Sequence, residues 1–326
     1  MPFFSVIIPN YNHAPFLKQR IESVLSQTST DFEIILLDDN STDNSLEILN
    51  EYRSNKKVSH LILNKENTGS LTSQWKKGIE LAKGDWIWIA ESDDLASPYF
   101  LEEFSKMIEA NPTAGLFYCD SLVADRTPEK IIGKFATRKN ELFSTQKWST
   151  PYCRKGIEEI NECLKYDSTV NNMSAVIFKK ELTTLILKGA GSFQYFADWY
   201  LYIKLCFETN ICYTPKTLNT YRVHPKSLLN ASTSLTISKK EYFEILRLLY
   251  HNDKVTERKK LVAHFVFNYL SFGLKEDGLD KGFCIIKNYF RSDKRLAFRV
   301  VGELVLIKLF YRKYKSKFEL KASKAF

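Results

Sequence analysis

The first 120 residues of the chain alternate short apolar runs with stretches in which apolar residues recur at helical spacing. The apolar runs predict buried strands over residues 3–9, 32–38, 58–64 and 85–90. The stretches between them predict helices, since Leu17, Ile21 and Val24 share one helical face and a further helix is expected over 70–83. Strands that alternate with helices in this way predict a mostly parallel α/β sheet covered by helices.

The pattern changes along the rest of the chain. Strands over 113–119 and 173–179 and a helix over 195–208 are predicted, whereas the polar residues 126–150 predict a long loop. From residue 238 onward the pattern is helical, with helices expected over 239–250, 257–273, 278–290 and 294–315. We therefore expect an α/β domain over 1–225 and a helical basic extension over 226–326.

The residues that follow each apolar run are the candidates for chemistry, because such sheets bind ligands beyond the carboxyl ends of their strands. They form four groups, which are Pro9, Asn10, Tyr11 and Asn12; Asp38 and Asp39; Asn67 and Gly69; and Glu91, Ser92, Asp93 and Asp94. Most of these side chains are polar, and we expect them to converge on one pocket.

The group at 91–94 places three carboxylates within four residues. A divalent cation would relieve their mutual repulsion, and Mg²⁺ or Mn²⁺ binds to carboxylates together with phosphate oxygens. The alternative is a solvated loop or a cap for the helix that begins near Ser97. The acidic pair at 38–39 favours the metal site, because two such groups at neighbouring strand ends are less easily explained as solubilising charge.

Tyr11 directly follows the first predicted strand. At this position an aromatic ring can stack on a nucleobase while an acid such as Asp39 accepts a base N–H. The alternative is a tyrosine that packs within its loop.

Five segments of the chain have a characteristic order and spacing. They are SVIIPNYN at 5–12, QTSTDFEIILLDDNSTDNS at 27–45, NTGS at 67–70, KGIELAKGDWIWIAESDD at 77–94 and ADWYLYIKL at 197–205. Together they resemble the family 2 glycosyltransferases, which have the GT-A fold. The resemblance covers about residues 3–225 and implies a Rossmann-like mixed sheet, with nucleotide-sugar binding in 1–115 and acceptor binding in 116–225.

The resemblance implies that the loops after the strands bind a nucleotide-sugar donor. The residues so assigned are Pro9, Asn10, Tyr11, Asn12, Asp38, Asp39, Asn67, Gly69, Glu91, Ser92 and Asp94, of which Pro9, Tyr11, Asp38 and Asp39 would bind the nucleoside. The family often has an arginine before the glycine that corresponds to Gly78. This chain has lysines there, and Lys76 or Lys77 would take over the diphosphate contact.

The resemblance also implies a metal and a catalytic base. Glu91 and Asp93 stand at the two acids of the family's Asp-x-Asp metal motif, with glutamate at the first position. His224, in the sequence Tyr-Arg-Val-His, resembles a late motif whose histidine completes the metal or phosphate site, the alternative being a surface histidine. Asp198 corresponds to the general base, although a helix N-cap is the alternative, and Trp199 is the candidate for contact with the acceptor.

The implied reaction is metal-dependent transfer of a sugar, with inversion, from a nucleoside diphosphate to a hydroxyl of a glycan or lipid-linked acceptor. UDP is the default nucleotide, Mn²⁺ or Mg²⁺ the cofactor, and surface polysaccharide synthesis the expected setting. A second hypothesis is a nucleotide-sugar binding protein without turnover, because Ala197 replaces the acid that precedes the base in the family. A third hypothesis is a nucleic-acid binding protein. The basic half of the chain contains no motif for nucleic-acid recognition, so we expect no nucleic-acid partner.

The amino-acid composition indicates the cellular compartment and shows how charge is distributed along the chain. The net charge of +9 combines about −5 in residues 1–150 with about +14 in residues 151–326. The six cysteines have neither Cys-x-x-Cys nor zinc-site spacing, and we expect them to be reduced structural thiols. The start of the chain lacks the basic region of a signal peptide, and no long uncharged apolar run occurs. We therefore expect a protein that is made and kept in the cytoplasm.

The last residues predict attachment to a membrane surface. Residues 296–310 are strongly apolar, and residues 308–326 carry seven lysines and arginines against the single acid Glu319. This combination is typical of a helix that lies on an anionic membrane, here the inner face of a bacterial cell membrane. The alternative is a helix that packs on the catalytic domain and is followed by a solvated basic tail.

Overall fold

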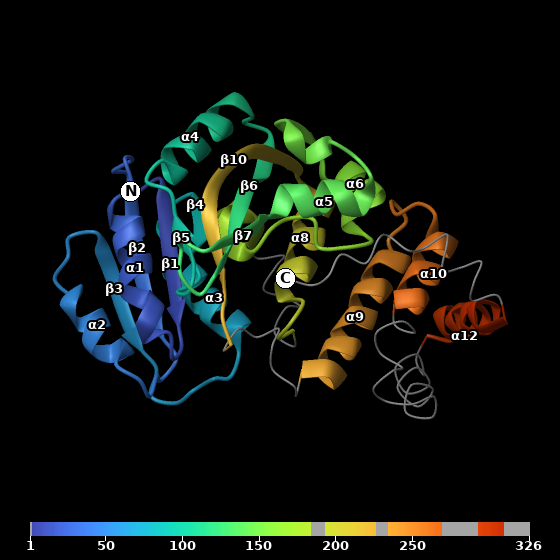
Figure 1. Ribbon diagram of the computed structural model, residues 1–326, viewed down its shortest axis with the longest axis horizontal. Coiled ribbons are helices and arrows are strands. Elements are labelled where there is room, and N and C mark those ends of the chain that lie inside the picture. Colours follow the sequence, from blue (N-terminus) through green and yellow to red (C-terminus); the bar gives the residue numbers. More distant parts are fainter. Residues whose placement is uncertain (1, 184–192, 226–233, 269–292, 310–326) are drawn as a thin grey trace. The chain divides into compact units, whose positions relative to one another are not determined.

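The computed structural model describes residues 2–183, 193–225, 234–268 and 293–309. The chain divides into two compact units (Figure 1). The first unit comprises residues 1–156 and 170–225, and the second comprises residues 157–169 and 226–325. Within the described residues, no helix has the length and apolar character needed to cross a membrane.

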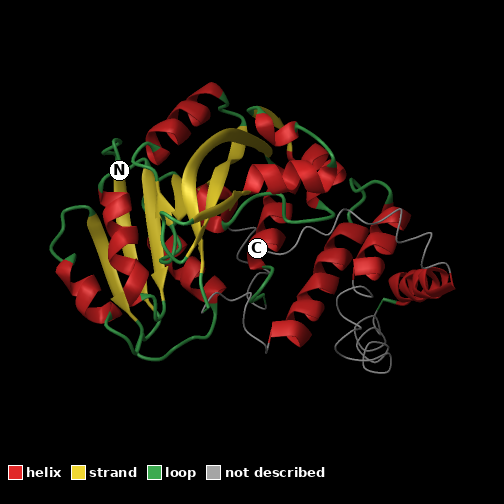
Figure 2. Cartoon of the chain, viewed as in Figure 1, coloured by secondary structure: helices red, strands yellow, loops and turns green. Residues whose placement is uncertain are grey.

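The first unit is built on a sheet of ten strands, drawn in yellow in Figure 2. The strands are β1 (Phe4–Asn10), β2 (Phe32–Asp38), β3 (Val58–Leu63), β4 (Trp86–Ile89), β5 (Leu95–Ala96), β6 (Ala114–Asp125), β7 (Ile131–Lys134), β8 (Tyr152–Lys155), β9 (Val176–Lys179) and β10 (Asn210–Val223). Their order is β3-β2-β1-β4-β9-β6-β10-β5, with β7 paired to β6 and β8 to β10. The mixed α/β sheet expected from the sequence is confirmed.

Strand direction decides where the strand ends meet. β3, β2, β1 and β4 are parallel, β9 is antiparallel to both β4 and β6, and β10 is parallel to β6. The carboxyl ends of β1, β2, β4 and β10 therefore all lie at one edge of the sheet. The loops that leave this edge carry the candidate site.

Helices surround the sheet and form the second unit (Figure 2). Those of the first unit are α1 (Ala14–Leu25), α2 (Ser45–Glu51), α3 (Leu71–Leu81), α4 (Phe100–Ala110), α5 (Phe135–Phe143) and α8 (Ala197–Glu208), and α6 (Gly156–Glu159) begins at its boundary. The second unit contains α9 (Ser234–Tyr250), α10 (Arg258–Asn268) and α12 (Lys294–Leu309). The predicted helix over 278–290 lies outside the described residues.

Both faces of the central strands are buried, which explains why these strands are apolar without alternation. Phe4, Val6 and Ile8 of β1 point to the face covered by α1, α2 and α4. Ile7 points to the opposite face, where it contacts α3 at Gly78. The burial of all seven β1 residues fits this position between two helical layers.

Gly84 lies where the chain enters β4, against the backbone of β1. A Cβ at this position would lie 2.7 Å from the carbonyl carbon of Phe4 and 2.8 Å from the nitrogen of Ser5. Because backbone atoms of a central strand cannot move aside cheaply, we expect Gly84→Ala to destabilise the protein by ~1–3 kcal/mol.

Thermal unfolding followed by circular dichroism tests this prediction. Gly302→Ala in α12 is the control, since nothing lies within 4 Å of its Cβ position, and it should leave stability unchanged or raise it by about 1 kcal/mol. An unaltered melting temperature for Gly84→Ala would show that β1 and β4 tolerate a wider separation.

The region from 126 to 155 corrects one prediction. The loop expected over 126–150 contains β7, α5 and a 3₁₀ turn at Lys147–Ser149. The strand β10 was also missed, because Thr, Lys, Asn and Pro interrupt its apolar pattern. Its pairing with three other strands supplies the order that its sequence does not signal.

The cysteines correct a second prediction. Cys153 and Cys212 are paired residues of the antiparallel strands β8 and β10, and they form a disulfide. Cys119, Cys163 and Cys206 are buried and form no disulfide, as expected for structural thiols. The pair was not predictable because β10 itself was not.

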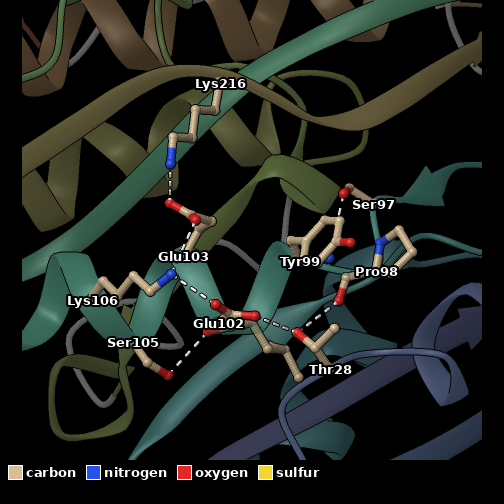
Figure 3. A network of polar contacts seen from close by, with 10 residues as sticks. Thr28, Ser97, Pro98, Tyr99, Glu102, Glu103, Ser105, Lys106 and Lys216 are labelled. Atoms are coloured by element: carbon tan, nitrogen blue, oxygen red, sulfur yellow. Dashed lines mark hydrogen bonds and ion pairs between the residues drawn. The ribbon is translucent and has the colours of Figure 1, made fainter.

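An exposed polar network joins α4 to its surroundings (Figure 3). Glu102 accepts hydrogen bonds from Thr28 Oγ1 (2.7 Å) and Lys106 Nζ (2.7 Å), and Glu103 accepts one from Lys216 Nζ of β10 (2.5 Å). Solvent screens such pairs, so each adds little to stability. The network joins the first turns of α4 to Thr28 and to β10.

Candidate functional site

Side-chain hydrogen bonds join the ends of β1 and β2. Asn10 Nδ2 donates to Asp38 Oδ2 (2.7 Å) and to Ser41 Oγ (3.1 Å). Asp38 also accepts from the backbone N–H of Ser41 (2.8 Å). Asn12 has a left-handed φ of 55°, and its Oδ1 accepts from the backbone N–H of Thr42 (2.7 Å). The three predicted residues Asn10, Asn12 and Asp38 are thus brought together, and they fix the two loops against each other.

Asp39 is buried and holds the loop that follows β3. Its carboxylate accepts from Asn64 Nδ2 (2.6 Å), from Thr68 Oγ1 (2.8 Å) and from Gln74 Nε2 of α3 (2.8 Å). The backbone N–H of Thr68 donates to the same carboxylate (3.1 Å). Asp39 therefore connects the end of β2 to the start of α3.

The next residues of this edge are exposed. The Tyr11 side chain is 45% exposed at the end of β1, while Pro9 is buried within that strand. Gly69 has a φ of 60°, and its N–H donates to Asn67 Oδ1 (2.5 Å) in an exposed turn. Tyr11 is thus available for stacking.

The two lysines considered for a diphosphate contact have different surroundings. The Lys76 ammonium is exposed and lies 3.9 Å from the Glu80 carboxylate, one turn along α3. Lys77 instead donates to Asn64 Oδ1 (2.5 Å). Because exposed i,i+4 pairs bind weakly, Lys76 can leave Glu80 at little cost.

Glu91 and Asp94 of the loop after β4 are held by different elements. Trp75 Nε1 of α3 donates to Glu91 Oε1 (2.9 Å). Asp94 is buried and accepts from Asn172 Nδ2 and from the backbone N–H of Arg222 (3.1 Å). The carboxylates of this acidic loop, residues 91–94, are therefore already separated by the protein.

Two buried arginines hold the backbone of the acidic loop. Arg20 Nε of α1 donates to the carbonyl of Glu91 (2.8 Å), and Arg222 Nε of β10 donates to the carbonyl of Asp93. Burial lowers the pKa of Arg20 to about 10, and the charges of Asp94 and Asp93 oppose this shift. The two guanidinium groups place positive charge beneath a loop of like negative charges.

Asp93 forms a cluster with two histidines. One ligand atom from each of His13, Asp93 and His224 lies within 4.8 Å of the others. His224 Nε2 is 3.1 Å from Asp93 Oδ2, and the two imidazole rings meet edge to face at 5.4 Å. His13 Nδ1 is 2.8 Å from Ser92 Oγ. The structure thus brings the predicted ligands Asp93 and His224 together, and adds His13, whereas Glu91 stands outside this group.

Burial and neighbouring charges shift the pKa values of the three carboxyl groups in different directions. Burial and the charge of Asp93 raise the pKa of Glu91 to about 8, although the hydrogen bond from Trp75 opposes this. Burial and Asp93 also raise the pKa of Asp94. Burial acts on Asp93 in the same direction, but the hydrogen bond with His224 and the charge of His13 lower its pKa below the ordinary value. Negative charge is therefore concentrated on the carboxylate that faces the imidazoles.

Asp198 approaches this region from a separate element. It is the second residue of α8, half-buried, and its Oδ1 accepts from the backbone N–H of Trp199 (2.7 Å). Together with burial, the charges of Asp198 and Glu91 raise the pKa of Tyr202, and Asp94, Asp93 and Asp198 all raise that of Tyr221. Asp198 thus shares its electrostatic environment with the acidic loop. Phe196, and not Asp198, is the N-cap of α8.

Trp199 is buried, with 3% of its surface exposed, and its ring lies edge-on to that of Phe196 at 5.9 Å. Its predicted contact with an acceptor has only this small surface in the described conformation. Packing of α8 accounts for the indole ring.

Comparison with known proteins decides the family. Residues 5–160 match Glycosyl transferase family 2. This segment belongs to that family. The glycosyltransferase domain contains the ends of β1, β2 and β4, whereas Asp198 and His224 lie beyond the matched residues.

Curated relatives are similar to part of this chain. TuaG of Bacillus subtilis, described as a putative teichuronic acid biosynthesis glycosyltransferase, is 33% identical over 128 residues, which are 39% of this chain and 50% of that protein. The chain spans only 38%, 32% and 41% of three other curated glycosyltransferases that it matches.

Two solved structures establish the likeness of fold. Residues 1–349 of Staphylococcus aureus TarS in complex with UDP-GlcNAc align with a TM-score of 0.68 and 16% identity, over 96% of this chain and 92% of that one. The mannosyltransferase PcManGT of Pyrobaculum calidifontis, in complex with GDP-Man and Mn²⁺, aligns with a TM-score of 0.56 and 15% identity, over 98% and 84%. The sheet and its helices therefore have the GT-A fold.

Several residues that contact the acidic loop of the glycosyltransferase domain were not predicted, among them His13, Arg20 and Trp75. His13 follows β1 in the same loop as Tyr11 and Asn12, so its position was a usable signal. Arg20 and Trp75 lie within α1 and α3, where the helical pattern indicates only packing. Their contacts with residue 91 depend on how the helices cross the sheet edge.

Proposed function

We propose that this chain is an inverting, metal-dependent glycosyltransferase of the hexosyltransferase type. It would transfer a sugar from a nucleoside diphosphate, UDP by default, to a hydroxyl acceptor. The observation that carries the proposal is the convergence of Asp93, His13 and His224 at the sheet edge from which Tyr11 and the Asp39 loop also project. The family of residues 5–160 and the UDP-GlcNAc complex of the TarS structure support it.

The donor atoms of the cluster fit a divalent cation. One carboxylate and two imidazoles suit Mn²⁺ better than Mg²⁺, which prefers oxygen ligands alone. His13, Asp93 and His224 would hold the ion, and Glu91 would stay on Trp75. When bound, the cation would stabilise the charge that develops on the departing diphosphate. The complex of the mannosyltransferase with Mn²⁺ supports this choice of metal.

The chain's own residues would position the donor. Tyr11 would stack on the base, while Asp38 and Asp39 hold the two loops between which the nucleoside lies. Lys76, freed from Glu80, would approach the phosphates. Asp198 would accept the proton of the acceptor hydroxyl as it attacks the anomeric carbon from the face opposite the leaving group, and this geometry gives inversion.

The acceptor would be a glycan or a lipid-linked sugar used in the synthesis of a surface polysaccharide. The relative TuaG, a putative teichuronic acid biosynthesis glycosyltransferase, supports this setting. Residues 116–225, which supply Asp198, would form the acceptor side of the site.

Donor binding should depend on both nucleotide and metal. We expect a UDP-sugar with Mn²⁺ to raise the melting temperature, because a ligand at 100 times its Kd stabilises the folded state by about 2.7 kcal/mol. A panel of UDP-, GDP- and dTDP-sugars, each with Mn²⁺ and with EDTA, measures this by thermal shift. Equal shifts in Mn²⁺ and EDTA would contradict the metal site, and no shift with any donor would contradict the proposed function.

Turnover separates the enzyme from a nucleotide-sugar binding protein. Release of free nucleoside diphosphate from the donor that gives the largest shift, with and without added acceptor sugars, should rise with Mn²⁺. Binding without any release would favour a protein that retains the donor site alone.

A further inference from the structure

The second unit carries an apolar surface on α12. Phe298, Val301 and Val305 are 82%, 42% and 51% exposed, and Leu306 is also exposed. Spacings of three, four and seven residues place the first three on one side of the helix. Gly302 lies between them with open space at its Cβ position. We call Phe298, Val301, Val305 and Leu306 the α12 stripe.

The opposite side of the same helix packs within the second unit. Leu296 and Val300 are buried, and α12 packs against α10. The helix therefore has a folding face and a second apolar face. Because the folding face already fixes the orientation of α12, the α12 stripe is not needed for the stability of the unit, and its exposure indicates a partner.

Cations accompany the stripe. Lys294, Arg295 and Arg299 are exposed, and among the described residues none of them forms an ion pair. With Phe298 they line an open pocket whose other lining residues are Tyr250, His251, Asp253 and Arg258. Asp253, the acid in this lining, is paired with Arg258 at 2.9 Å. The pocket is thus cationic with aromatic walls.

The sequence that follows the α12 stripe is also positively charged. Residues 308–326 add seven lysines and arginines against one acid, and residues 151–326 carry a net charge of about +14. A second copy of the chain would bring like charges together at the stripe, which opposes self-association. An anionic lipid surface matches both the charge and the apolar side chains.

We propose that α12 docks on an anionic phospholipid bilayer. The α12 stripe would enter the interfacial layer, while Lys294, Arg295 and Arg299 contact lipid phosphates. This inference does not depend on the proposed glycosyl transfer, because all its residues belong to the second unit. A peripheral attachment of this kind needs no membrane-spanning helix.

The test is sedimentation of the full chain with vesicles, without nucleotide. Vesicles of phosphatidylcholine alone are compared with vesicles that also contain phosphatidylglycerol, at low and high salt. We expect retention only by the anionic vesicles and loss of retention at high salt. Arg295→Glu with Arg299→Glu should weaken binding about 30-fold or more, since each basic residue contributes about fivefold near an anionic surface. Phe298→Ser with Val301→Ser and Val305→Ser should also abolish retention.

Matched controls keep the result interpretable. Ile131→Ser with Ile132→Ser removes similarly exposed apolar side chains from β7, and Arg126→Glu with Lys130→Glu reverses exposed cations of the first unit. Neither should change retention, and circular dichroism verifies that every variant is folded. Equal retention by neutral vesicles, or full retention by both α12 variants, would overturn the proposal. A dimer in sedimentation velocity that the serine variant converts to a monomer would also overturn it, by assigning the stripe to self-association.

Discussion

Asp93→Asn should abolish both binding of the divalent cation and sugar transfer. The substitution removes the only carboxylate of the proposed ligand set and leaves an amide between two imidazoles. Loss of a metal ion that stabilises developing charge costs several kcal/mol in the transition state, so we expect a decrease in kcat/KM of ~1,000-fold or more. The lowered pKa of the Asp93 carboxyl means that the wild-type ligand is charged throughout the neutral range.

The measurement has two parts. Binding of Mn²⁺ is followed by electron paramagnetic resonance without substrate, and transfer is followed by release of the nucleoside diphosphate. His13→Ala and His224→Ala should each weaken Mn²⁺ binding. Glu91→Gln is the control, because its carboxylate is held by Trp75 and lies outside the cluster. If wild-type activity were equal in EDTA and in Mn²⁺, or if Glu91→Gln lost the metal as completely as Asp93→Asn, the ligand assignment would be wrong.

The edge of the sheet was predictable because topology determines it. Four apolar runs separated by helices require parallel strands, and parallel strands bring their carboxyl ends together. Asn10, Asp38 and Asp94 therefore fall in one region without any knowledge of tertiary contacts. The GT-A resemblance extended this reasoning to His224, which pairs with Asp93 across 131 residues.

Contacts made by helix side chains were not predictable. The sequence pattern predicts that Trp75 is one apolar residue of an amphipathic helix. Its indole N–H, however, determines where the Glu91 carboxylate points. Arg20 is hidden in the same way, since an arginine in a helix normally indicates the solvent side. Here it is buried beneath the acidic loop, whose negative charge opposes the effect of desolvation on the guanidinium group.

The strand β10 illustrates a third limit. Its sequence NICYTPKTLNTYRV lacks both strand alternation and a continuous apolar run, and its order comes from pairing with β5, β6 and β8. Because this strand was not predicted, the Cys153–Cys212 disulfide was not predicted either. The same strand explains why Arg222 and His224 lie beside Asp93 and Asp94. A single long-range strand therefore accounts for several features that local pattern could not supply.

Asp198→Asn should preserve donor binding and lose transfer by ~100-fold or more, the usual contribution of a general base. A carboxylate placed beside the acceptor hydroxyl can accept its proton as the acceptor oxygen attacks the anomeric carbon. Asparagine keeps an oxygen that can accept from the backbone N–H of Trp199, so the start of α8 should stay in place. The change therefore removes basicity with little effect on geometry.

A comparison within α8 distinguishes this role from a structural one. Glu208→Gln makes the same chemical change at an exposed residue of the same helix, and it should leave both donor binding and transfer unaltered. The UDP-sugar thermal shift of Asp198→Asn should equal that of the wild type, while its kcat falls. Because the acid and its amide differ in proton affinity and hardly in size, transfer within a few-fold of wild type would mean that another group takes the acceptor proton. A lost thermal shift would instead mean that Asp198 acts in donor binding.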